Sequence, residues 1–398
     1  MSVLAQEPMP SDAEAGAAAL SVTVFDSLEA AEADWRAIEA DGVLTPYQRY
    51  DWIKAAMDAG VEPTGRVAIA IVGTEGRPVA VLPLLVERRL GLATARLMGA
   101  HISNSDWLAM RRGFVPTPEQ LAAIWAGIGR EIGGLDLVSF FNQPQSWQGV
   151  ANPILALGGD PAPNNFYFET IGPTPVPYIE HRLSQKKRSN IRRGARRLEE
   201  SFGKLELRQA NDVAELEKVH VAFLAQRGER FEQMGIGNVF AEPYFQRFFK
   251  LAAINGFGAE RPALRFHALY AGDEIVATTC GTYGATHYSQ YINSTSSGPA
   301  AKYSLMGVLV AELMDELTAA GILTFDMGIG DFEYKTDWTE PQPLYGSLIA
   351  VTLRGRVVAS GLRSGQQAKR FVKQNPALWR LAQAARLALY RLRKLVGR

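Results

Sequence analysis

The sequence is poor in the residues that build disulfides and metal sites. Its 398 residues include one cysteine, Cys280, and five scattered histidines. A single cysteine excludes an intramolecular disulfide and a multi-cysteine metal site, and it is typical of a reducing compartment. The histidines show neither metal-ligand spacing nor the neighbours expected of a Ser-His-Asp triad, so we predict no metal. Cys280 lies in a strand-like apolar run, where it is interpreted as a small buried hydrophobe.

Long apolar runs and an early cationic segment are also missing. No uninterrupted apolar stretch approaches the roughly 20 residues that span a bilayer. No Lys or Arg precedes Arg36, whereas a signal peptide begins with a cationic segment. We therefore expect a cytoplasmic protein. Residues 1–19, which are rich in Ala, Glu, Asp and Pro up to residue 17, are predicted to be a disordered leader.

Between residues 20 and 172 the sequence alternates strand-like and helix-like segments. Strands are predicted at 21–27, 67–72, 79–89, 95–100 and 136–143, and helices at 28–42, 46–60 and 118–132. Such alternation gives an α/β layered domain. The stretch from about residue 144 to residue 180 is rich in Pro, Gly and Asn and is interpreted as a connector.

A second unit is predicted at residues 173–355, followed by a basic helical tail at 356–398. Its helices are expected at 184–203, 211–230, 242–254 and 304–320, and its strands at 264–270, 275–283 and 287–294. The strand-turn-strand order of 264–283 matches that of 67–89, although few residues are identical. We infer two copies of one α/β unit, each with a mixed, partly antiparallel sheet flanked by helices; two unrelated domains are the alternative.

The stretch 322–338 (ILTFDMGIGDFEYKTDW) reads as a buried strand that runs into a polar loop. The loop contains four groups that can perform acid–base or charge chemistry: Asp331, Glu333, Tyr334 and Lys335. Acyl transfer to an amine needs a base, and a carboxylate at a sheet edge can serve. We assign this role to Asp331, the stabilisation of developing negative charge to Lys335, and reprotonation of the leaving group to Tyr334. A solvated loop whose charges pair with one another is the alternative.

The loop before the helix at 304–320 is a second candidate. A helix N-terminus presents unpaired N–H groups and a partial positive charge, and so accepts phosphate or pyrophosphate. Ser296 and Gly298 keep the loop small, and Lys302 adds a cation. Helix capping alone is an equally simple explanation for small polar residues at this point.

The helix at 184–203 is a third candidate because of its charge. The whole chain has a net charge of only +1, yet eight cations and no acid lie between Arg182 and Arg197. Arg188, Arg192 and Arg196 fall at helical spacing. A charge run is often just a solvated face, but like charges repel one another, which favours an anionic partner such as phosphate groups, a nucleic acid or an acidic lipid surface.

Together, these stretches resemble the GNAT-type acetyltransferases of the FemAB-like branch, proteins often described as cellulose- or exopolysaccharide-biosynthesis acetyltransferases. The resemblance covers about residues 20–355. It is carried by the basic helix KKRSNIRRGARRLEE, the hairpin LRFHALYAGDEIVATTCGTYG and the stretch FDMGIGDFEYKTDW. The peptidoglycan-bridge Fem ligases have a similar basic helix and a similar Tyr-Lys pair near the end.

The resemblance implies two tandem GNAT-like units and an acyl donor, usually acetyl-CoA. Carried onto this sequence, the donor site comprises Ile292, Asn293, Ser294, Ser296, Gly298, Lys302 and Ser304. Lys335 matches the Tyr-Lys position that lies near the reacting centre in the Fem-like branch. Asp106 lies where related enzymes place an acceptor-binding acid, and Arg188 and Arg192 are expected to contact substrate.

We therefore expect an N-acyltransferase that moves an acetyl group to an amine of a sugar or of a polysaccharide or envelope precursor. One alternative is a ligase that depends on aminoacyl-tRNA, as in the Fem ligases, and another is a non-catalytic GNAT scaffold in polysaccharide biosynthesis. The tail at 356–398 has eleven cations and no acid. It is expected to pack on the body of the protein or to contact an anionic membrane surface or a synthase complex.

Overall fold

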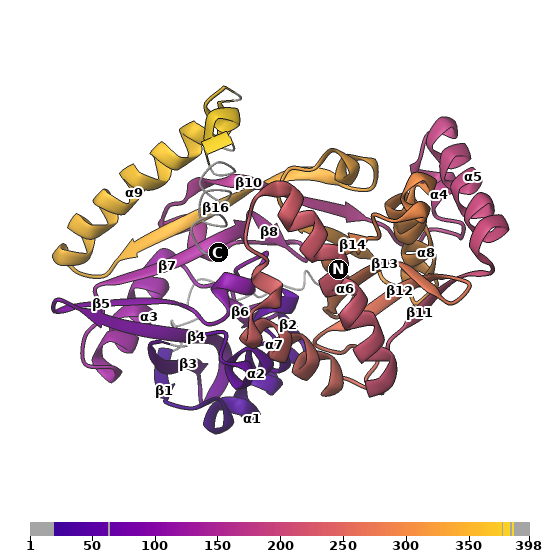
Figure 1. Ribbon diagram of the computed structural model, residues 1–398. Helices are drawn as coiled ribbons and strands as arrows, with labels where there is room; N and C mark the ends of the chain where they lie inside the picture. Colours follow the sequence, from indigo (N-terminus) through magenta and orange to yellow (C-terminus); the bar gives the residue numbers. More distant parts are fainter. Residues whose placement is uncertain (1–19, 63, 376, 383, 386–398) are drawn as a thin grey trace, which may run out of the picture.

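The computed structural model describes residues 20–62, 64–375, 377–382 and 384–385. The predicted leader at 1–19 and much of the end of the predicted tail lie outside this range. Within it, fourteen strands join into one sheet, with helices packed on its faces (Figure 1).

The first half of the chain supplies strands and helices in the expected order. Its strands are β1 (Leu20–Phe25), β2 (Gly42–Val43), β3 (Arg66–Thr74), β4 (Arg77–Arg89), β5 (Leu92–Leu97), β6 (Ala109–Arg111), β7 (Leu137–Pro144), β8 (Ser146–Trp147), β9 (Val150–Ala151) and β10 (Asp160–Thr170). Its helices are α1 (Leu28–Glu39), η1 (Pro46–Gln48), α2 (Tyr50–Ala59), η2 (Ala100–Ile102), α3 (Pro118–Glu131) and η3 (Pro153–Leu157). Helix α1 buries the four apolar positions of its periodic pattern, and the Ser27 side chain accepts a hydrogen bond from the backbone N–H of Ala30.

The second half repeats this arrangement. Its strands are β11 (Leu205–Gln209), β12 (Arg265–Ala271), β13 (Glu274–Tyr283), β14 (His287–Thr295), β15 (Thr324–Ile329) and β16 (Glu340–Ala350). Its helices are α4 (Ile179–Arg182), α5 (Gln185–Phe202), α6 (Val213–Met234), η4 (Val239–Ala241), α7 (Pro243–Ile254), η5 (Pro299–Tyr303), α8 (Leu305–Ala319), η6 (Glu333–Asp337) and α9 (Leu353–Gln374). Each half contains one short parallel pairing, β5 with β7 and β14 with β15. The fold is therefore a tandem pair of GNAT-like α/β units.

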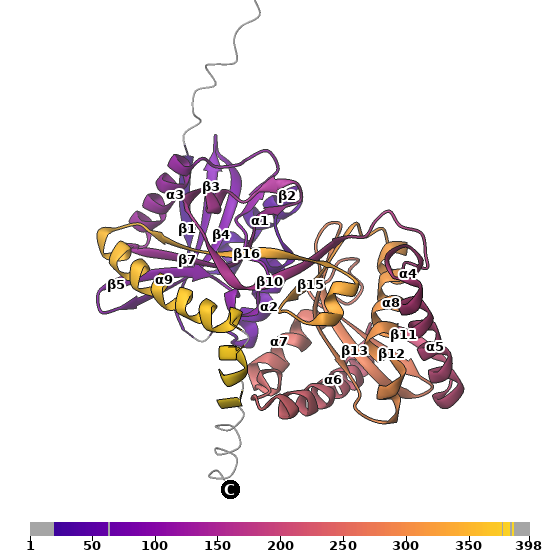
Figure 2. The same ribbon diagram turned by 90° about the horizontal axis from the view of Figure 1, so that it is seen from above.

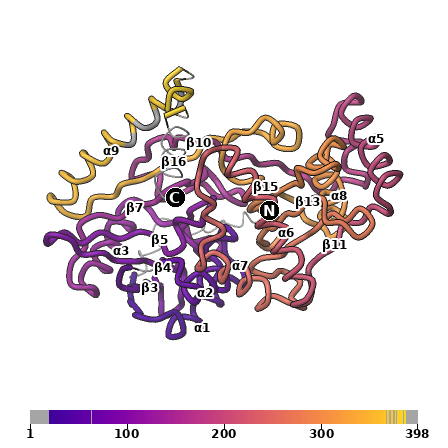
Figure 3. The backbone as a smooth tube through the Cα atoms, in the orientation of Figure 1, coloured from indigo at the N-terminus to yellow at the C-terminus, as the bar shows by residue number. Residues whose placement is uncertain are grey.

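The two units exchange their last strands. The sheet runs β1-β3-β4-β5-β7-β16-β10-β15-β14-β13-β12-β11, with β2 and β6 attached beside β4. Strand β10 of the first half pairs antiparallel with β15, and β16 of the second half pairs antiparallel with β7. Figure 2 shows β10 and β16 running side by side across the middle of the molecule, and the tube in Figure 3 follows the same crossing.

Strand β10 corrects the prediction of a connector at 144–180. This segment contains a central strand of the sheet rather than a simple linker. Proline has no N–H to donate in a sheet and is rare inside strands. Because of Pro161 and Pro163, the sequence of this segment is not typical of a strand. The structure accommodates them where the β10–β16 register shifts, between Pro161 and Asn165. The apolar end of the strand then pairs regularly, with Phe166 opposite Gln342 and Phe168 opposite Glu340.

The first unit also contacts the second through side chains. Helix α2 packs against α7, and the rings of Trp52 and Phe248 meet edge to face with their centroids 4.9 Å apart. Both side chains are fully buried in one apolar cluster that draws on both halves of the chain. The halves are thus joined by a shared core as well as by a shared sheet.

The predicted tail begins as helix α9, which packs on the first unit. Ala359 is buried against Leu137 of β7 and Leu348 of β16. Arg363 donates a hydrogen bond of 3.0 Å to the Leu348 carbonyl and lies 3.5 Å from the carboxylate of Asp160. Figure 1 shows α9 lying across the upper side of the sheet, above β7 and β16. No helix in the described part of the chain is both long and apolar enough to cross a bilayer.

The strand exchange predicts that the halves do not fold separately. A fragment of residues 20–172 would expose the edge of β7 and leave β10 without a sheet, and a fragment of residues 173–375 would expose β15 and leave β16 unpaired. We expect each fragment alone to be unfolded or aggregated, and the co-expressed fragments to form a one-to-one complex in gel filtration. Far-UV circular dichroism checks the result, and a cooperative melt of either fragment alone would contradict it.

Candidate active site

A cavity of about 520 Å³ opens where β14 and β15 separate. The two strands pair in parallel at only three positions, ending at Ser289 opposite Asp326. Beyond that point they diverge and expose side chains and backbone groups of both strands. The cavity is lined by Asn104, Arg227, Arg230, Phe231, Met234, Ile236, Gln290, Tyr291, Ile292, Asn293, Ser294, Thr295, Met306, Met327, Ile329, Phe332, Tyr334 and Lys335.

Lys335 is the buried charged group of the cavity wall. Its side chain is 4% exposed, and its Nζ donates to the carbonyl of Ile329 at 2.9 Å and to that of Gly328 at 3.5 Å. Burial lowers the pKa of this ammonium to about 8, against the opposing effect of the carboxylates of Asp326 and Asp331. The ammonium group is therefore held at a fixed point of the cavity.

Tyr334 and Asn293 form a second polar part of the wall. The Asn293 amide donates to the Tyr334 hydroxyl at 3.1 Å, and burial raises the pKa of that phenol. The backbone carbonyl of Asn293 accepts a hydrogen bond of 3.1 Å from Arg227 on α6. Three of the residues predicted to bind the donor, Ile292, Asn293 and Ser294, thus line the cavity.

Arg227 was not among the residues chosen from the sequence. Its Nε is buried without a hydrogen-bond partner, its guanidinium lies 4.7 Å from the centre of the Phe231 ring, and burial lowers its pKa to about 10. The signal that could have revealed it is its spacing. Arg227 lies four residues from both Phe223 and Phe231, on the apolar face of the helix. Charged side chains are rare on such a face, so an arginine there is a candidate functional residue.

Two buried amides complete the wall, and one of them comes from the first unit. Gln290 of β14 donates to Thr279 Oγ1 at 3.0 Å, and its Oε1 has no partner. Asn104 follows η2 in the first unit and donates to the hydroxyl of Tyr47 at 2.9 Å. The sequence analysis missed both, although Asn104 lies two residues from the predicted site residue Asp106. The cavity is consequently built by both units.

The loop predicted to hold the catalytic groups divides between two environments. Tyr334 and Lys335 line the cavity, whereas Asp331 and Glu333 are exposed and do not line it. Asp331 Oδ1 accepts hydrogen bonds of 3.1 Å from Tyr167 and from Asn165 on β10. Its charge still reaches Lys335, as the pKa of that group shows.

The predicted phosphate loop lies beside the cavity rather than in its wall. Ser296, Gly298, Lys302 and Ser304 are not lining residues, but their neighbours Thr295 and Met306 are. Ser304 precedes α8 with a left-handed φ of 56°, and the Ser296 hydroxyl accepts a hydrogen bond of 3.1 Å from the Gly298 N–H. The N-terminus of α8 therefore faces the region next to the mouth of the cavity.

The basic helix α5 packs directly against this loop. A Cβ at Gly194 would lie 2.5 Å from the carbonyl oxygen of Tyr303, so only glycine permits the close approach. The structure thus brings together two candidates that are more than a hundred residues apart in sequence. Arg193 and Arg197 of α5 remain exposed, as does Lys302 of η5.

Three predicted substrate contacts lie outside the cavity. Arg188 donates to the carbonyls of Glu180 and Leu183 at 3.1 and 2.9 Å, and Arg192 forms an ion pair with the Glu180 carboxylate. Asp106 is buried; its Oδ2 accepts a hydrogen bond of 2.8 Å from the Phe141 N–H, and burial raises its pKa to about 7. In this structure all three make intramolecular contacts.

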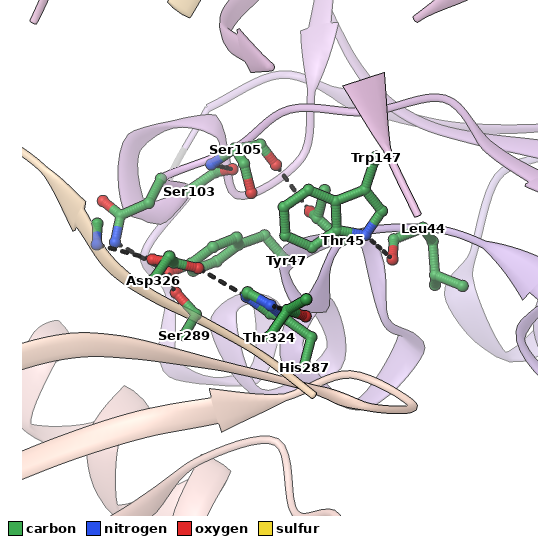
Figure 4. A network of polar contacts seen from close by, with 12 residues as sticks. Leu44, Thr45, Tyr47, Ser103, Ser105, Trp147, His287, Ser289, Thr324 and Asp326 are labelled. Carbon is green, nitrogen blue, oxygen red and sulfur yellow. Dashed lines mark hydrogen bonds and ion pairs between the residues drawn. The ribbon is translucent and has the colours of Figure 1, made fainter. Parts of the chain in front are cut away.

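A buried polar network joins residues of the two units (Figure 4) and includes Asn104 of the cavity wall. Asp326 of β15 accepts hydrogen bonds from Ser289 Oγ at 2.8 Å and from the Gly328 N–H at 2.7 Å, and it lies 2.7 Å from His287 Nε2. Tyr47 of the first unit extends the network through a contact of 2.6 Å with Ser289. Residues of this network were not chosen from the sequence.

In the described residues we find no group of three or more His, Cys, Asp or Glu side chains that could hold a metal ion. The polar side chains in the cavity wall carry amine, phenol, guanidinium, amide and hydroxyl groups.

Residues 185–336 match the family described as Acetyltransferase (GNAT) domain. The matched segment runs from the start of α5 into η6 and contains both strands of the cavity. A GNAT domain thus forms this part of the chain, and the protein is an acyltransferase. No curated protein matches the sequence.

Several solved structures are similar to this chain at low sequence identity. A crystal structure of FemX has a TM-score of 0.56 and 10% identity, covering 79% of this chain and 95% of that chain. L-PGS from Bacillus licheniformis has a TM-score of 0.48 and 14% identity, covering 84% and 96%. A tandem GNAT protein from the clavulanic acid biosynthesis pathway has a TM-score of 0.44 and 12% identity, covering 84% and 99%. The similarity to FemX supports the fold.

The buried ammonium of Lys335 predicts a specific pH dependence of stability. Its pKa is about 8 in the folded state, against 10.5 for an unperturbed lysine, so the unfolded state binds more protons between these values. The free energy of unfolding of the wild type, relative to a Lys335→Met variant, should rise with pH in this window by up to about 3 kcal/mol. Urea denaturation at several pH values measures the difference. A difference that stays flat with pH for Lys335→Met would contradict the assignment.

Proposed function

We propose that the protein transfers an acetyl group from acetyl-CoA to an amine, and that the reaction takes place in the cavity between β14 and β15. The observation that supports this most directly is the position of a buried ammonium, Lys335, at the separation of the two strands, next to the N-terminus of α8. Pyrophosphate is suited to a helix N-terminus with an adjacent lysine, and Lys302 lies in the preceding turn. The thioester would then extend from this loop into the cavity along Ile292–Ser294.

In the proposed reaction the acceptor amine attacks the thioester carbonyl carbon, a C–N bond forms and the C–S bond breaks. The ammonium of Lys335 stabilises the negative charge that develops on the carbonyl oxygen. The Tyr334 hydroxyl protonates the departing thiolate. The amine proton leaves through water, and we keep Asp331 as its acceptor because that carboxylate is close enough to influence Lys335. Arg227 and Asn293 fix the wall opposite the reacting carbonyl.

The proposed acceptor is an amino sugar or an amine on a polysaccharide or envelope precursor, and the proposed location is the cytoplasm. The acceptor assignment rests on the family resemblance in the sequence, and the size of the cavity is compatible with a small precursor. A cavity whose wall contains amides from Asn104, Gln290 and Asn293 offers hydrogen-bond donors and acceptors that suit the hydroxyl groups of a sugar.

A second candidate function is aminoacyl transfer from tRNA. The observation that favours it is the basic surface formed by the exposed Arg193 and Arg197 of α5 and Lys302 of η5. This candidate predicts tRNA affinity that falls steeply with salt and is weakened by Arg193→Glu with Arg197→Glu. A third candidate, a non-catalytic scaffold, predicts neither coenzyme nor tRNA binding.

The donor assignment is tested by calorimetry with acetyl-CoA. Gly298→Glu places a carboxylate in the loop, where an added Cβ would meet only Ser296 Oγ at 3.3 Å, so the fold should be retained. We expect at least a tenfold loss of acetyl-CoA affinity through charge repulsion, about 1.4 kcal/mol. The matched control is Gly361→Glu on α9, where an added Cβ has no neighbour within 4 Å. Equal affinity in both folded variants would remove the loop from the donor site.

We further propose that α9 brings the enzyme to an anionic membrane surface. Its inner side packs on the first unit through Ala359 and Arg363, while the apolar side chains of Val357 and Phe371 remain exposed. The tail sequence contains cations and no acid, and a basic helix with an exposed apolar face suits an anionic lipid surface.

Vesicle sedimentation tests this surface. A Val357→Glu/Phe371→Glu variant should lose most of its binding to vesicles that contain phosphatidylglycerol, because it replaces apolar contacts with repelled charges. The matched control, Val115→Glu/Val176→Glu, changes two exposed valines elsewhere and should bind as the wild type does. Acetyl-CoA affinity should be the same in all three proteins. Absence of wild-type binding, or binding that the α9 variant retains, would refute the membrane surface and favour packing on the body or on a protein partner.

A further inference from the structure

The carboxylate of Asp326 is buried and does not line the cavity, although the next residue of β15, Met327, does. Asp326 is fully buried, and in the hydrogen bonds that lead to it each donor points towards the carboxylate. Asn104 Nδ2 donates to the Tyr47 oxygen at 2.9 Å, and Ser289 Oγ donates to Asp326 Oδ1 at 2.8 Å. The contact of 2.6 Å between Tyr47 and Ser289 is therefore a hydrogen bond from the phenol to the serine oxygen. The chain starts at the cavity wall in the first unit and ends on the carboxylate.

Two further polar groups contact Asp326. The Gly328 N–H donates to Oδ1 at 2.7 Å, and His287 Nε2 lies 2.7 Å from Oδ2. The hydrogen bonds from Ser289 and from the Gly328 N–H both end on Oδ1, so this oxygen acts as an acceptor. On the other side of the imidazole, Nδ1 lies 2.9 Å from Thr324 Oγ1. Figure 4 shows Ser289 and His287 approaching Asp326 from β14.

The hydrogen bond to Gly328 connects the carboxylate to Lys335. Gly328 has a left-handed φ of 65°, and a Cβ there would lie 2.5 Å from the Asn104 amide. The turn that Asp326 holds in this way presents the carbonyls of Gly328 and Ile329, and these are the two acceptors of the Lys335 ammonium. Removal of the carboxylate would therefore change both the position of the Lys335 ammonium and its pKa.

We propose that Asp326 is a positioning residue for the acyl-transfer centre: it holds the turn that binds Lys335, supplies the negative charge near that ammonium, and links it to Asn104 of the first unit. The proposal rests on the role of Lys335 in the proposed function. It also gives the first unit a defined part in the reaction. Asn104, in the loop after η2, and Tyr47 of η1 are connected to the Asp326 carboxylate through hydrogen bonds that pass by way of Ser289.

The charged neighbours of Lys335 differ in how strongly they affect its pKa. The titratable groups that face it from β15, β10, α6 and its own loop are Asp326, Asp331, Tyr167, Tyr334, Arg227 and Arg230. Of the two carboxylates, Asp326 raises the pKa of the amine more than Asp331 does. Since only the neutral amine reacts with an acylating reagent, the pH dependence of its labelling reports this charge directly.

The experiment is competitive labelling of the whole protein with acetic anhydride across a pH series, with the modification of Lys335 followed by peptide mass spectrometry. In the wild type the midpoint should lie near pH 8, the folded-state pKa, well below the 10.5 of an unperturbed lysine. Asp326→Asn keeps the shape and removes the charge, so the midpoint should fall by roughly one pH unit. Asp331→Asn should produce a smaller shift, and Ser289→Ala, which keeps the charge, should leave the midpoint in place.

The outcomes separate the inference from the proposed function. An unchanged midpoint in Asp326→Asn, or in Asp326→Ser where the asparagine variant does not fold, overturns the inference. A wild-type Lys335 midpoint near 10.5, the value of an unperturbed lysine, also overturns it, because the amine would then not be held in its buried position near the carboxylate. A lowered midpoint in a variant that retains acetyl-CoA affinity supports the inference, since a general loss of structure would weaken the affinity and raise the midpoint towards the 10.5 of an unperturbed lysine. Absence of acetyl-CoA binding by the wild type contradicts the proposed function and leaves the labelling result valid.

Discussion

The pairing of β10 with β16 is the constraint on which the remaining structure depends. Each of these strands completes the sheet of the other half of the chain, so the two units form one fourteen-stranded sheet. Antiparallel pairing satisfies the backbone groups of both strands, and an unpaired strand in either place would leave a central edge open. The relative position of the units is fixed by the same hydrogen bonds that complete each sheet, and this is what allows residues of the first unit to reach a cavity in the second.

The two units contribute to the cavity in different ways. Both units contain a short parallel pairing at which two strands begin to separate. In the second unit the separation opens into a cavity lined by Lys335, Tyr334 and Arg227. In the first unit the loop that follows β5 contributes the buried residues Asn104 and Asp106, and Asn104 lines the cavity of its neighbour. The first unit thus acts as part of the wall.

Much of the fold could be predicted from the sequence because it depends on local periodicity. The helices α1, α2, α3 and α7 and the hairpins β3–β4 and β12–β13 follow apolar patterns that their own residues determine. Strand β10 could not be found in this way, since its prolines and asparagines are tolerated only because β15 and β16 pair with the strand on both sides. The strand exchange is likewise invisible to local patterns, because it is decided by pairing between residues more than 150 positions apart.

The candidate site was predicted in part for a similar reason. The stretch 322–338 directed attention to the end of β15, where Tyr334 and Lys335 line the cavity. Which of its four polar residues point inward depends on the turn at Gly328 and on η6, which a sequence pattern does not reveal. Arg227, Asn104 and the carboxylate of Asp326 come from other elements, and only their burial in the folded protein distinguishes them from ordinary polar residues.

The most direct test of the central claim, that the second unit binds the acyl donor where β14 and β15 separate, is amide hydrogen exchange with and without acetyl-CoA. The account predicts slower exchange in residues 291–306, from the cavity wall through the loop to the start of α8, with a smaller effect in residues 331–338. Exchange around the corresponding separation in the first unit, residues 94–106, should change little beyond the contact at Asn104. Protection confined to the first unit, or no protection by acetyl-CoA anywhere, would contradict it.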